Sequence, residues 1–157
     1  MSIERARAHL AKHSLSERII EFEVSSATVA LAAAALGTEE ARIAKTLSFE
    51  TPEAIILIVT AGDVKISNAK YKEFFHTKAK MLSYDTVEAR IGHGVGGVCP
   101  FGVNEGVRVY LDVSLRRFDT VYPAAGTASS AVRLTVEELE RASESLGWID
   151  VTQPITA

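Results

Sequence analysis

The stretch RIAKTLSFETPEAIILIVTAGD, residues 42 to 63, decides the fold class of this chain. Residues 42–50 have the pattern of a β-strand. Residues 53–61 form the apolar run of a buried central strand, and Gly62 with Asp63 supplies the turn that ends it. A buried sheet is therefore expected at the centre of the fold.

Helical and strand patterns alternate along the rest of the chain. Helices are expected at 3–10, at 25–37 beginning at Ser25 or Ser26, after Ser67, at 85–92, and after Thr135, where Thr135 and Glu138 form a capping box. Their inward-facing residues are expected to include Tyr71, Phe74, Phe75, Val136, Leu139, Ala142 and Leu146. Further strands are expected at 79–83, 107–115, 119–124 and 130–136. This succession of strands argues against a purely doubly wound sheet, so the sequence predicts an α/β fold with a mixed sheet.

The composition is that of one globular domain spanning residues 1–157. The chain is 47% apolar and 24% charged, and its length suffices for one buried core. Its longest apolar runs are much shorter than a bilayer span, and its start lacks the apolar stretch of a secretory signal. A single cysteine excludes an internal disulfide framework and fits a reducing compartment. A cytoplasmic location is expected.

The charge is unevenly distributed along the chain. A net charge of −3 argues against wholesale nucleic-acid binding, yet residues 65–80 hold five lysines against Glu73 alone. These are Lys65, Lys70, Lys72, Lys78 and Lys80. They could bind a phosphate backbone, but composition alone favours a solvated helix with ordinary surface lysines.

Lys45 is chemically unusual for its place in a strand. In a strand over 42–50 it shares a face with Ile43, Leu47 and Phe49, all of them apolar. A lysine there must either extend its amine to water or lose hydration, which lowers its pKa. Lys45 is therefore a candidate catalytic residue. The alternatives are an edge-strand lysine that prevents aggregation, or a helix-end lysine if the preceding helix continues to residue 45.

The segment GHGVGGVCPFG, residues 92–102, is the second candidate feature. Its glycines do not fit a dinucleotide fingerprint, because the segment leads from a helix into a strand, and no Gly-Lys-Ser/Thr follows as in a Walker loop. A loop with exposed N–H groups could bind a phosphate or a developing oxyanion. A wide structural turn is the alternative.

Together these residues resemble one known family. The resemblance rests on KTL at 45–47, GD at 62–63, GVGGVCPFG at 94–102, AAG at 124–126 and LTVEEL at 134–139. In this order they resemble the YbaK/prolyl-tRNA synthetase-associated domain family, over about residues 20–145. The resemblance implies a single domain with a curved mixed β-sheet surrounded by helices. It also implies hydrolysis, in trans, of the ester that joins a wrong amino acid to the 3′ terminal adenosine of a tRNA.

The resemblance assigns roles to individual residues. Lys45 matches the family's essential lysine and would supply positive charge, while Gly96 and Gly97 would bring bare backbone and N–H groups to the ester carbonyl. The other residues expected to contact the substrate are Thr46, Asp63, His93, Val98, Cys99, Pro100 and Gly126. The five lysines of 65–80 are the candidate tRNA contacts. By resemblance, the family uses a water, or the substrate's own groups, instead of a protein nucleophile, and no cofactor is expected.

No metal is expected, because His9, His13 and His76 show no metal-ligand grouping in the sequence. The expected partner is a mischarged aminoacyl-tRNA, with transient association with an aminoacyl-tRNA synthetase as a second possibility. Three functions from different classes stay open. They are an aminoacyl-tRNA deacylase, a non-catalytic RNA- or nucleotide-binding module of the same fold, and a small-ester hydrolase that depends on Cys99.

Overall fold

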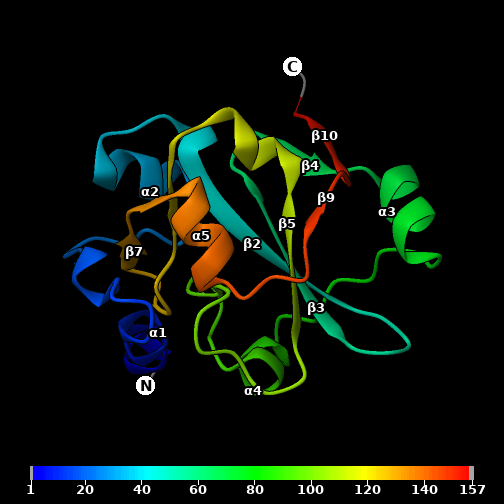
Figure 1. Ribbon diagram of the computed structural model, residues 1–157, viewed down its shortest axis with the longest axis horizontal. Helices are drawn as coiled ribbons and strands as arrows, with labels where there is room; N and C mark the ends of the chain where they lie inside the picture. The colour runs from blue at the N-terminus through cyan, green and yellow to red at the C-terminus, as the bar shows by residue number, and fades with distance from the viewer. Residues whose placement is uncertain (1, 156–157) are drawn as a thin grey trace.

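The computed structural model describes residues 2–155, in which helices and strands alternate along the chain (Figure 1). The helices are α1 (Ser2–Ala11), α2 (Val29–Leu36), α3 (Asn68–Phe75), α4 (Val87–Ile91) and α5 (Val136–Ala142). The strands are β1 (Ile19–Glu21), β2 (Ile43–Glu50), β3 (Ile55–Ala61), β4 (Val64–Ile66), β5 (Arg108–Asp112), β6 (Thr120–Pro123), β7 (Ser130–Val132), β8 (Leu134–Thr135), β9 (Trp148–Ile149) and β10 (Thr152–Pro154). Within these residues no helix has the length and hydrophobicity needed to cross a bilayer.

The main sheet has six strands in the order β8-β6-β2-β3-β5-β9. Strands β2 and β3 are antiparallel and pair from Ala44 opposite Ala61 to Glu50 opposite Ile55. The pairs β2–β6, β3–β5 and β5–β9 are parallel, and β6–β8 is antiparallel. The sheet is therefore mixed, as predicted. Two small antiparallel ladders, β1–β7 and β4–β10, lie beside it.

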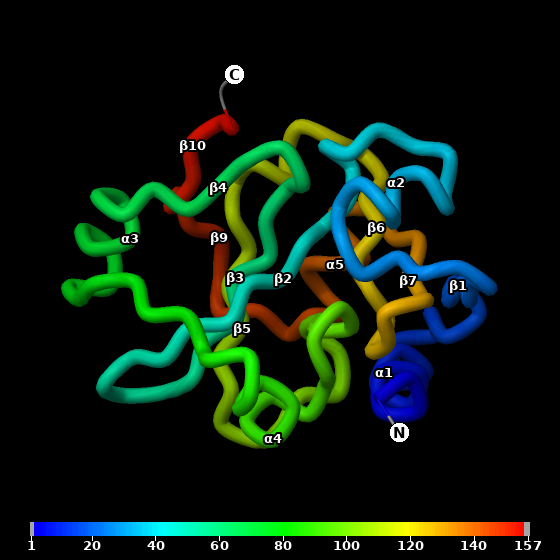
Figure 2. The backbone as a smooth tube through the Cα atoms, turned by 180° about the vertical axis from the view of Figure 1, so that it is seen from behind, coloured from blue at the N-terminus to red at the C-terminus, as the bar shows by residue number. Residues whose placement is uncertain are grey.

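The two faces of the sheet belong to different parts of the core. On one face, Leu57 and Val59 pack in the cluster that contains Leu10 of α1 and Leu139 of α5. On the other face, Ile58 packs in the cluster that contains Tyr71 of α3. Figures 1 and 2 show α3 at one side of the molecule and α1 and α2 at the other. The apolar run of β3 is buried on both faces for this reason.

Local chemistry sets the helix boundaries. The side chains of Thr28 and Ser67 accept hydrogen bonds from N–H groups in the first turns of α2 and α3. The capping box of Thr135 and Glu138 is present at α5. α2 ends at Gly37, whose φ of 69° is in the left-handed region that favours glycine.

Some sequence-based boundaries are wrong. Helix α2 begins after Thr28 and not after Ser25 or Ser26, because the N–H of Ser26 donates to the carbonyl of Ala128 instead. Helix α5 ends at Ala142, so Leu146 is exposed and not part of a buried stripe. Phe74 is also exposed, whereas Tyr71 is buried as expected.

The strand predictions fail where the chain changes partners. Residues 79–83 contribute only an isolated bridge between Met81 and Phe49. The strand expected over 107–115 stops at Asp112, because a 3₁₀ helix, Val113–Arg117, follows with Asp112 as its cap. Residues 130–136 form two short strands, which pair with β1 and β6 respectively.

Candidate active site

A cavity opens where β2 separates from β6. The two strands pair only at Ile43 and Ala44, opposite Tyr122 and Pro123. Farther along β2, a different segment takes over the edge. The N–H of Leu82 donates to the carbonyl of Ser48 at 3.1 Å, and the N–H of Glu50 donates to the carbonyl of Lys80 at 2.9 Å. Between these two ladders lies a cavity of about 380 Å³.

The main chain of Thr46 faces this unpaired edge. Within an antiparallel ladder, the N–H and C=O of one residue point to the same side, and successive residues alternate. Ser48 and Glu50 turn theirs toward residues 80–82, so Thr46 also turns its N–H and C=O away from β3. The ladders on either side end before they reach it. Its hydroxyl oxygen is likewise buried without a partner among residues 2–155.

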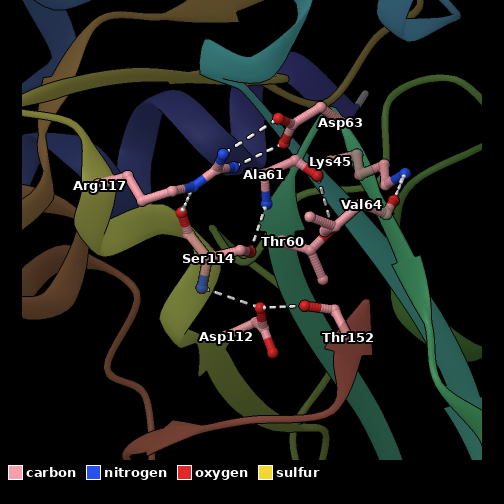
Figure 3. A network of polar contacts seen from close by, with 9 residues as sticks. All are labelled: Lys45, Thr60, Ala61, Asp63, Val64, Asp112, Ser114, Arg117 and Thr152. Carbon is pink, nitrogen blue, oxygen red and sulfur yellow. Dashed lines mark hydrogen bonds and ion pairs between the residues drawn. The ribbon is translucent and has the colours of Figure 1, made fainter. Parts of the chain in front are cut away.

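Lys45 lines the same cavity and is half-buried. Its ammonium group donates a hydrogen bond to the carbonyl of Val64, the first residue of β4 (Figure 3). Burial lowers the pKa of Lys45, because water no longer solvates the charged form, and the nearby carboxylate of Asp63 opposes this effect. Lys45 thus places a partly desolvated cation at the wall of the cavity.

Asp63 does not line the cavity, because its carboxylate is paired elsewhere. Both of its oxygens accept hydrogen bonds from the guanidinium of Arg117, at 2.6 and 3.0 Å (Figure 3). These bonds lower the pKa of Asp63 and keep it ionised. Asp63 therefore acts on Lys45 only through its charge.

A polar network beneath this pair fixes the turn that carries Val64. The side chain of Ser114 accepts from the N–H of Ala61 at 3.1 Å, and its own N–H donates to buried Asp112 at 2.9 Å. Asp112 also accepts from the hydroxyl of Thr152 at 2.7 Å (Figure 3). Sequence reasoning missed Arg117, Ser114 and Asp112, since nothing in their local spacing marks them as partners of the β3–β4 turn.

The glycine loop approaches the cavity at Gly96. Gly96 and Val98 line it, and Gly96 has a φ of 87°. Gly97 lies outside the lining, and its N–H donates to the carbonyl of Gly94 at 3.0 Å. A Cβ at Gly97 would lie 2.5 Å from main-chain atoms of Gly126 and Thr127. The geometry thus gives Gly97 a packing role in place of the expected oxyanion contact.

Gly126 and Pro100 also lie away from this cavity. Gly126 has a φ of 98°, and a Cβ there would lie 2.5 Å from the carbonyl oxygen of Ser2. Pro100 is buried and lines a second cavity, next to α1. The glycines of residues 92–102 and Gly126 mainly allow chain segments to pack against one another.

Cys99 and His93 are buried and do not face the cavity. Burial raises the pKa of Cys99 to about 12, so the thiolate is essentially absent at neutral pH. Burial also lowers the pKa of His93, whose Nε2 lies 2.6 Å from the carbonyl oxygen of Phe101 and donates to it. His93 was expected to contact the substrate, whereas the structure buries it away from the cavity.

All five lysines of residues 65–80 are exposed, but they differ in their partners. Lys70 pairs with Asp150 at 3.0 Å, and Lys80 pairs with Glu50 at 2.8 Å. Lys65, Lys72 and Lys78 have no ion pair within residues 2–155. The segment leads directly to Met81, Leu82 and Tyr84, which line the cavity.

Several cavity residues were not among the site residues expected from the sequence. The wall opposite β2 comes from residues 26–29 and from Tyr122, Ala124, Ser130 and Ala131. Met81 and Tyr84, which also line the cavity, are 58% and 76% exposed, which is high for apolar and aromatic residues. No carboxylate or imidazole lines the cavity within residues 2–155. The site thus offers a cation, hydroxyls and main-chain groups, but no evident general base.

Two of the histidines, which showed no metal-ligand grouping in the sequence, lie close to a carboxylate in the fold. His9 and His13 lie with Glu144 so that one ligand atom of each is within 4.8 Å of the others. The fold makes this grouping, because Glu144 follows α5 and is distant in sequence.

Comparison with known proteins identifies the family. Residues 23–142 match the aminoacyl-tRNA editing domain family. The chain belongs to this family. The resemblance noted in the sequence is thereby confirmed, and the match contains the β2 edge and the glycine loop.

Relatives of this editing domain agree with the assignment. It is 49% identical over 152 residues to the uncharacterized protein YwhH of Bacillus subtilis, covering 96% of this chain and 97% of that protein. A 71-residue segment is 25% identical to the proline–tRNA ligase of Leuconostoc mesenteroides, covering 45% of this chain and 12% of the ligase.

Solved structures share the fold over nearly the whole editing domain. The crystal structure of a candidate trans-editing enzyme for prolyl-tRNA synthetase superposes with a TM-score of 0.87 at 25% identity, covering 97% of both chains. The crystal structure of hypothetical protein APE2540 gives 0.78 at 26% identity, covering 87% of this chain and 91% of that one. These relations confirm the predicted mixed α/β fold and support a deacylase role.

Proposed function

We propose that this editing domain is a trans-acting aminoacyl-tRNA deacylase, for which residues 1–157 act as one unit. Its substrate would be a mischarged tRNA, of the tRNA(Pro) type or one carrying a small amino acid such as alanine, cysteine, serine or threonine. The observation that carries the proposal is the cavity at the unpaired β2 edge, which Lys45, Thr46 and Gly96 line. Family membership supports the reaction class.

The main-chain groups of Thr46 suit the amino-acid end of the substrate. Its C=O can accept from an α-amino group, and its N–H or hydroxyl can donate to an ester oxygen. A substrate would thereby satisfy polar groups that the protein leaves without ladder partners. The lining contributed by Ala27, Ala32 and Ala131 is apolar and leaves room for a small side chain.

Lys45 and Gly96 suit the charge that develops during hydrolysis. A water oxygen attacks the ester carbonyl, the carbonyl oxygen becomes an oxyanion, and the 3′ oxygen then leaves and takes up a proton. The Lys45 ammonium and the N–H of Gly96 are the groups of this cavity suited to stabilise such an oxyanion. Because no carboxylate or imidazole lines the cavity within residues 2–155, the substrate's own amino or hydroxyl group is the best candidate to accept the proton from water.

The rim and the lysine segment suit the rest of the tRNA. Tyr84 offers an exposed aromatic face on which the terminal adenine could stack. The lysines of residues 65–80 precede it and could contact phosphates nearby. A tRNA substrate places the activity in the cytoplasm, and a transient association with a synthetase would deliver it.

Two other functions are less well supported. A Cys99-dependent hydrolase needs a reachable thiolate, whereas Cys99 is fully buried with a pKa raised to about 12. A non-catalytic RNA-binding module would bind tRNA without needing a cavity lined by a half-buried lysine. Catalytic turnover of a mischarged tRNA would distinguish the deacylase from this non-catalytic module.

The decisive experiment incubates the purified protein with a panel of mischarged tRNAs and measures release of the amino acid. We expect catalytic turnover on at least one member of the panel and its loss in Lys45→Met. Binding without turnover across the panel would favour the non-catalytic module. Turnover that disappears in Cys99→Ser but persists in Lys45→Met would favour the cysteine hydrolase.

A further inference from the structure

The ends of two helices bring a histidine pair and a carboxylate together on the far side of the glycine loop. His9 lies in the last turn of α1, and His13 follows two residues after the helix ends. Glu144 follows α5, with a φ of 53°, a left-handed conformation that is uncommon for glutamate. The C-terminal end of a helix carries partial negative charge, so this location favours a cation.

The distances among these groups match those of a metal site. Glu144 Oε2 lies 3.4 Å from His9 Nε2 and 3.2 Å from His13 Nε2. Two ligands of a tetrahedral zinc ion, with bonds of about 2.0–2.1 Å, lie about 3.3 Å apart. His9 Nε2 donates a hydrogen bond to the carbonyl oxygen of Ala142 at 2.6 Å, so an ion bound at this nitrogen would replace that bond and release its proton.

The types of ligand atom indicate which ion this group could bind. Two imidazoles and one carboxylate favour zinc or a similar transition metal over Mg²⁺ and Ca²⁺, which prefer oxygen ligands. A cavity of about 580 Å³ borders His9 and Glu144 and gives access to them. We propose that His9, His13 and Glu144 form a zinc-binding site that ties the end of α1 to the end of α5.

This site is structural and independent of the proposed deacylation. The His9 ring packs against Phe101 of the glycine loop, with ring centroids 5.8 Å apart. A bound ion would hold α1, α5 and this part of the loop together. Lys12 opposes the ion, since its ammonium group lies 3.8 Å from Glu144 Oε2, but its side chain is 64% exposed and free to turn toward solvent.

The test uses the full chain without a histidine tag, stripped of metal by a chelator. Zinc is expected to raise Tm by several degrees in a saturable manner, whereas Mg²⁺ is expected to leave it unchanged. Co²⁺ is expected to give visible absorption bands that zinc abolishes. His13→Ala and Glu144→Gln should each weaken zinc binding more than about tenfold, and Lys12→Gln should tighten it.

His76 provides the matched control. It is an exposed histidine at the C-cap of α3, with a φ of 59° that asparagine tolerates, so His76→Asn should leave zinc binding unchanged. Absence of a saturable Tm rise would overturn the proposal. So would zinc affinity that survives in both His13→Ala and Glu144→Gln, or that is lost in His76→Asn.

Discussion

The ammonium group of Lys45 on β2 donates a hydrogen bond to the main-chain carbonyl of Val64 on β4. The lysine is thereby held across the turn after β3, at Gly62 and Asp63. Its position depends on the strand and on the turn together. The Arg117–Asp63 ion pair and the hydrogen bond from the N–H of Ala61 to the Ser114 hydroxyl hold that turn in place.

Removing the amine of Lys45 should abolish deacylation. We expect Lys45→Met to lower kcat/KM at least about a hundredfold, the typical loss when one group that stabilises an oxyanion is removed. The measurement is release of amino acid from the best mischarged tRNA, with circular dichroism as the check on folding. Full activity in a folded Lys45→Met protein would exclude a catalytic role.

The same variant should change how stability depends on pH. The folded state lowers the pKa of Lys45 below its ordinary value of 10.5, so folding disfavours the charged form. That cost is fully present below the lowered pKa and disappears as pH rises from the lowered pKa toward the unfolded value. Lys45→Met should therefore be more stable than the wild type at pH 7, with a difference that shrinks toward pH 10.5.

Chemical unfolding at several pH values measures this effect. A stability difference that stays constant with pH would mean that the loss of the Val64 hydrogen bond, and not desolvation, dominates.

The adjacent glycines Gly96 and Gly97 should respond differently to alanine. At Gly97 a Cβ would meet main-chain atoms at 2.5 Å, so Gly97→Ala should lower the free energy of unfolding by at least about 2 kcal/mol. At Gly96 the nearest atoms are the Cβ atoms of Ala128 and Ala27, at 3.0 and 3.1 Å. Gly96→Ala should cost about 1–2 kcal/mol for its positive φ and should also lower kcat.

Gly106 separates backbone strain from catalysis. Its φ of 91° is close to the 87° of Gly96, and nothing lies within 4 Å of its hypothetical Cβ. Gly106→Ala should therefore be destabilised to a similar degree as Gly96→Ala while it keeps normal kcat. If kcat falls equally in both variants, Gly96 has no specific part in the reaction.

Replacing the thiol of Cys99 should leave the reaction intact. Sγ lies 3.7 Å from the carbonyl oxygen of Phe101 and does not line the cavity. We expect Cys99→Ser to keep kcat/KM within about twofold of the wild type, because the buried thiol is protonated at neutral pH. The comparison uses the same tRNA as the Lys45 assay.

Lysines of the 65–80 segment should contribute unequally to tRNA affinity. Lys72 and Lys78 have no acidic partner within residues 2–155, whereas Lys70 is engaged with Asp150 and with the carbonyl of Thr152. Lys72→Gln and Lys78→Gln should each reduce the slope of log affinity against log salt by up to about 1. Lys70→Gln should change it less. If the salt dependence stays unchanged in all three variants, these lysines face solvent and do not contact tRNA phosphates.

The sequence was sufficient for elements whose cause is local. Periodicity predicted β2 and β3, and side-chain oxygens at Ser67 and Thr135 predicted the starts of α3 and α5. Prediction from the sequence failed where contacts with a distant segment determine the local structure. Ser26 pairs with Ala128 and so delays α2, and Asp112 caps a 3₁₀ helix where a longer strand was expected.

In the candidate site too, features with a local cause could be predicted, and features set by distant segments could not. Lys45 was recognisable because a charged side chain interrupted an apolar strand face. The different positions of Gly96 and Gly97, the burial of Cys99 and the capture of Asp63 by Arg117 depend on long-range packing. The grouping of His9 with Glu144 likewise exists only after α1 and α5 have packed.

The separation of β2 from β6 has a consequence for how such a domain diversifies. The β2 edge presents main-chain groups of Thr46, which mutation cannot easily alter, while other lining residues are 26–29, Val95, Gly96, Val98 and the segment around Tyr84. Substitutions at those other positions can reshape the space for a side chain without disturbing the register of the sheet. Under the proposed function, selectivity for a new amino acid can thus evolve separately from the fold and from the ester chemistry.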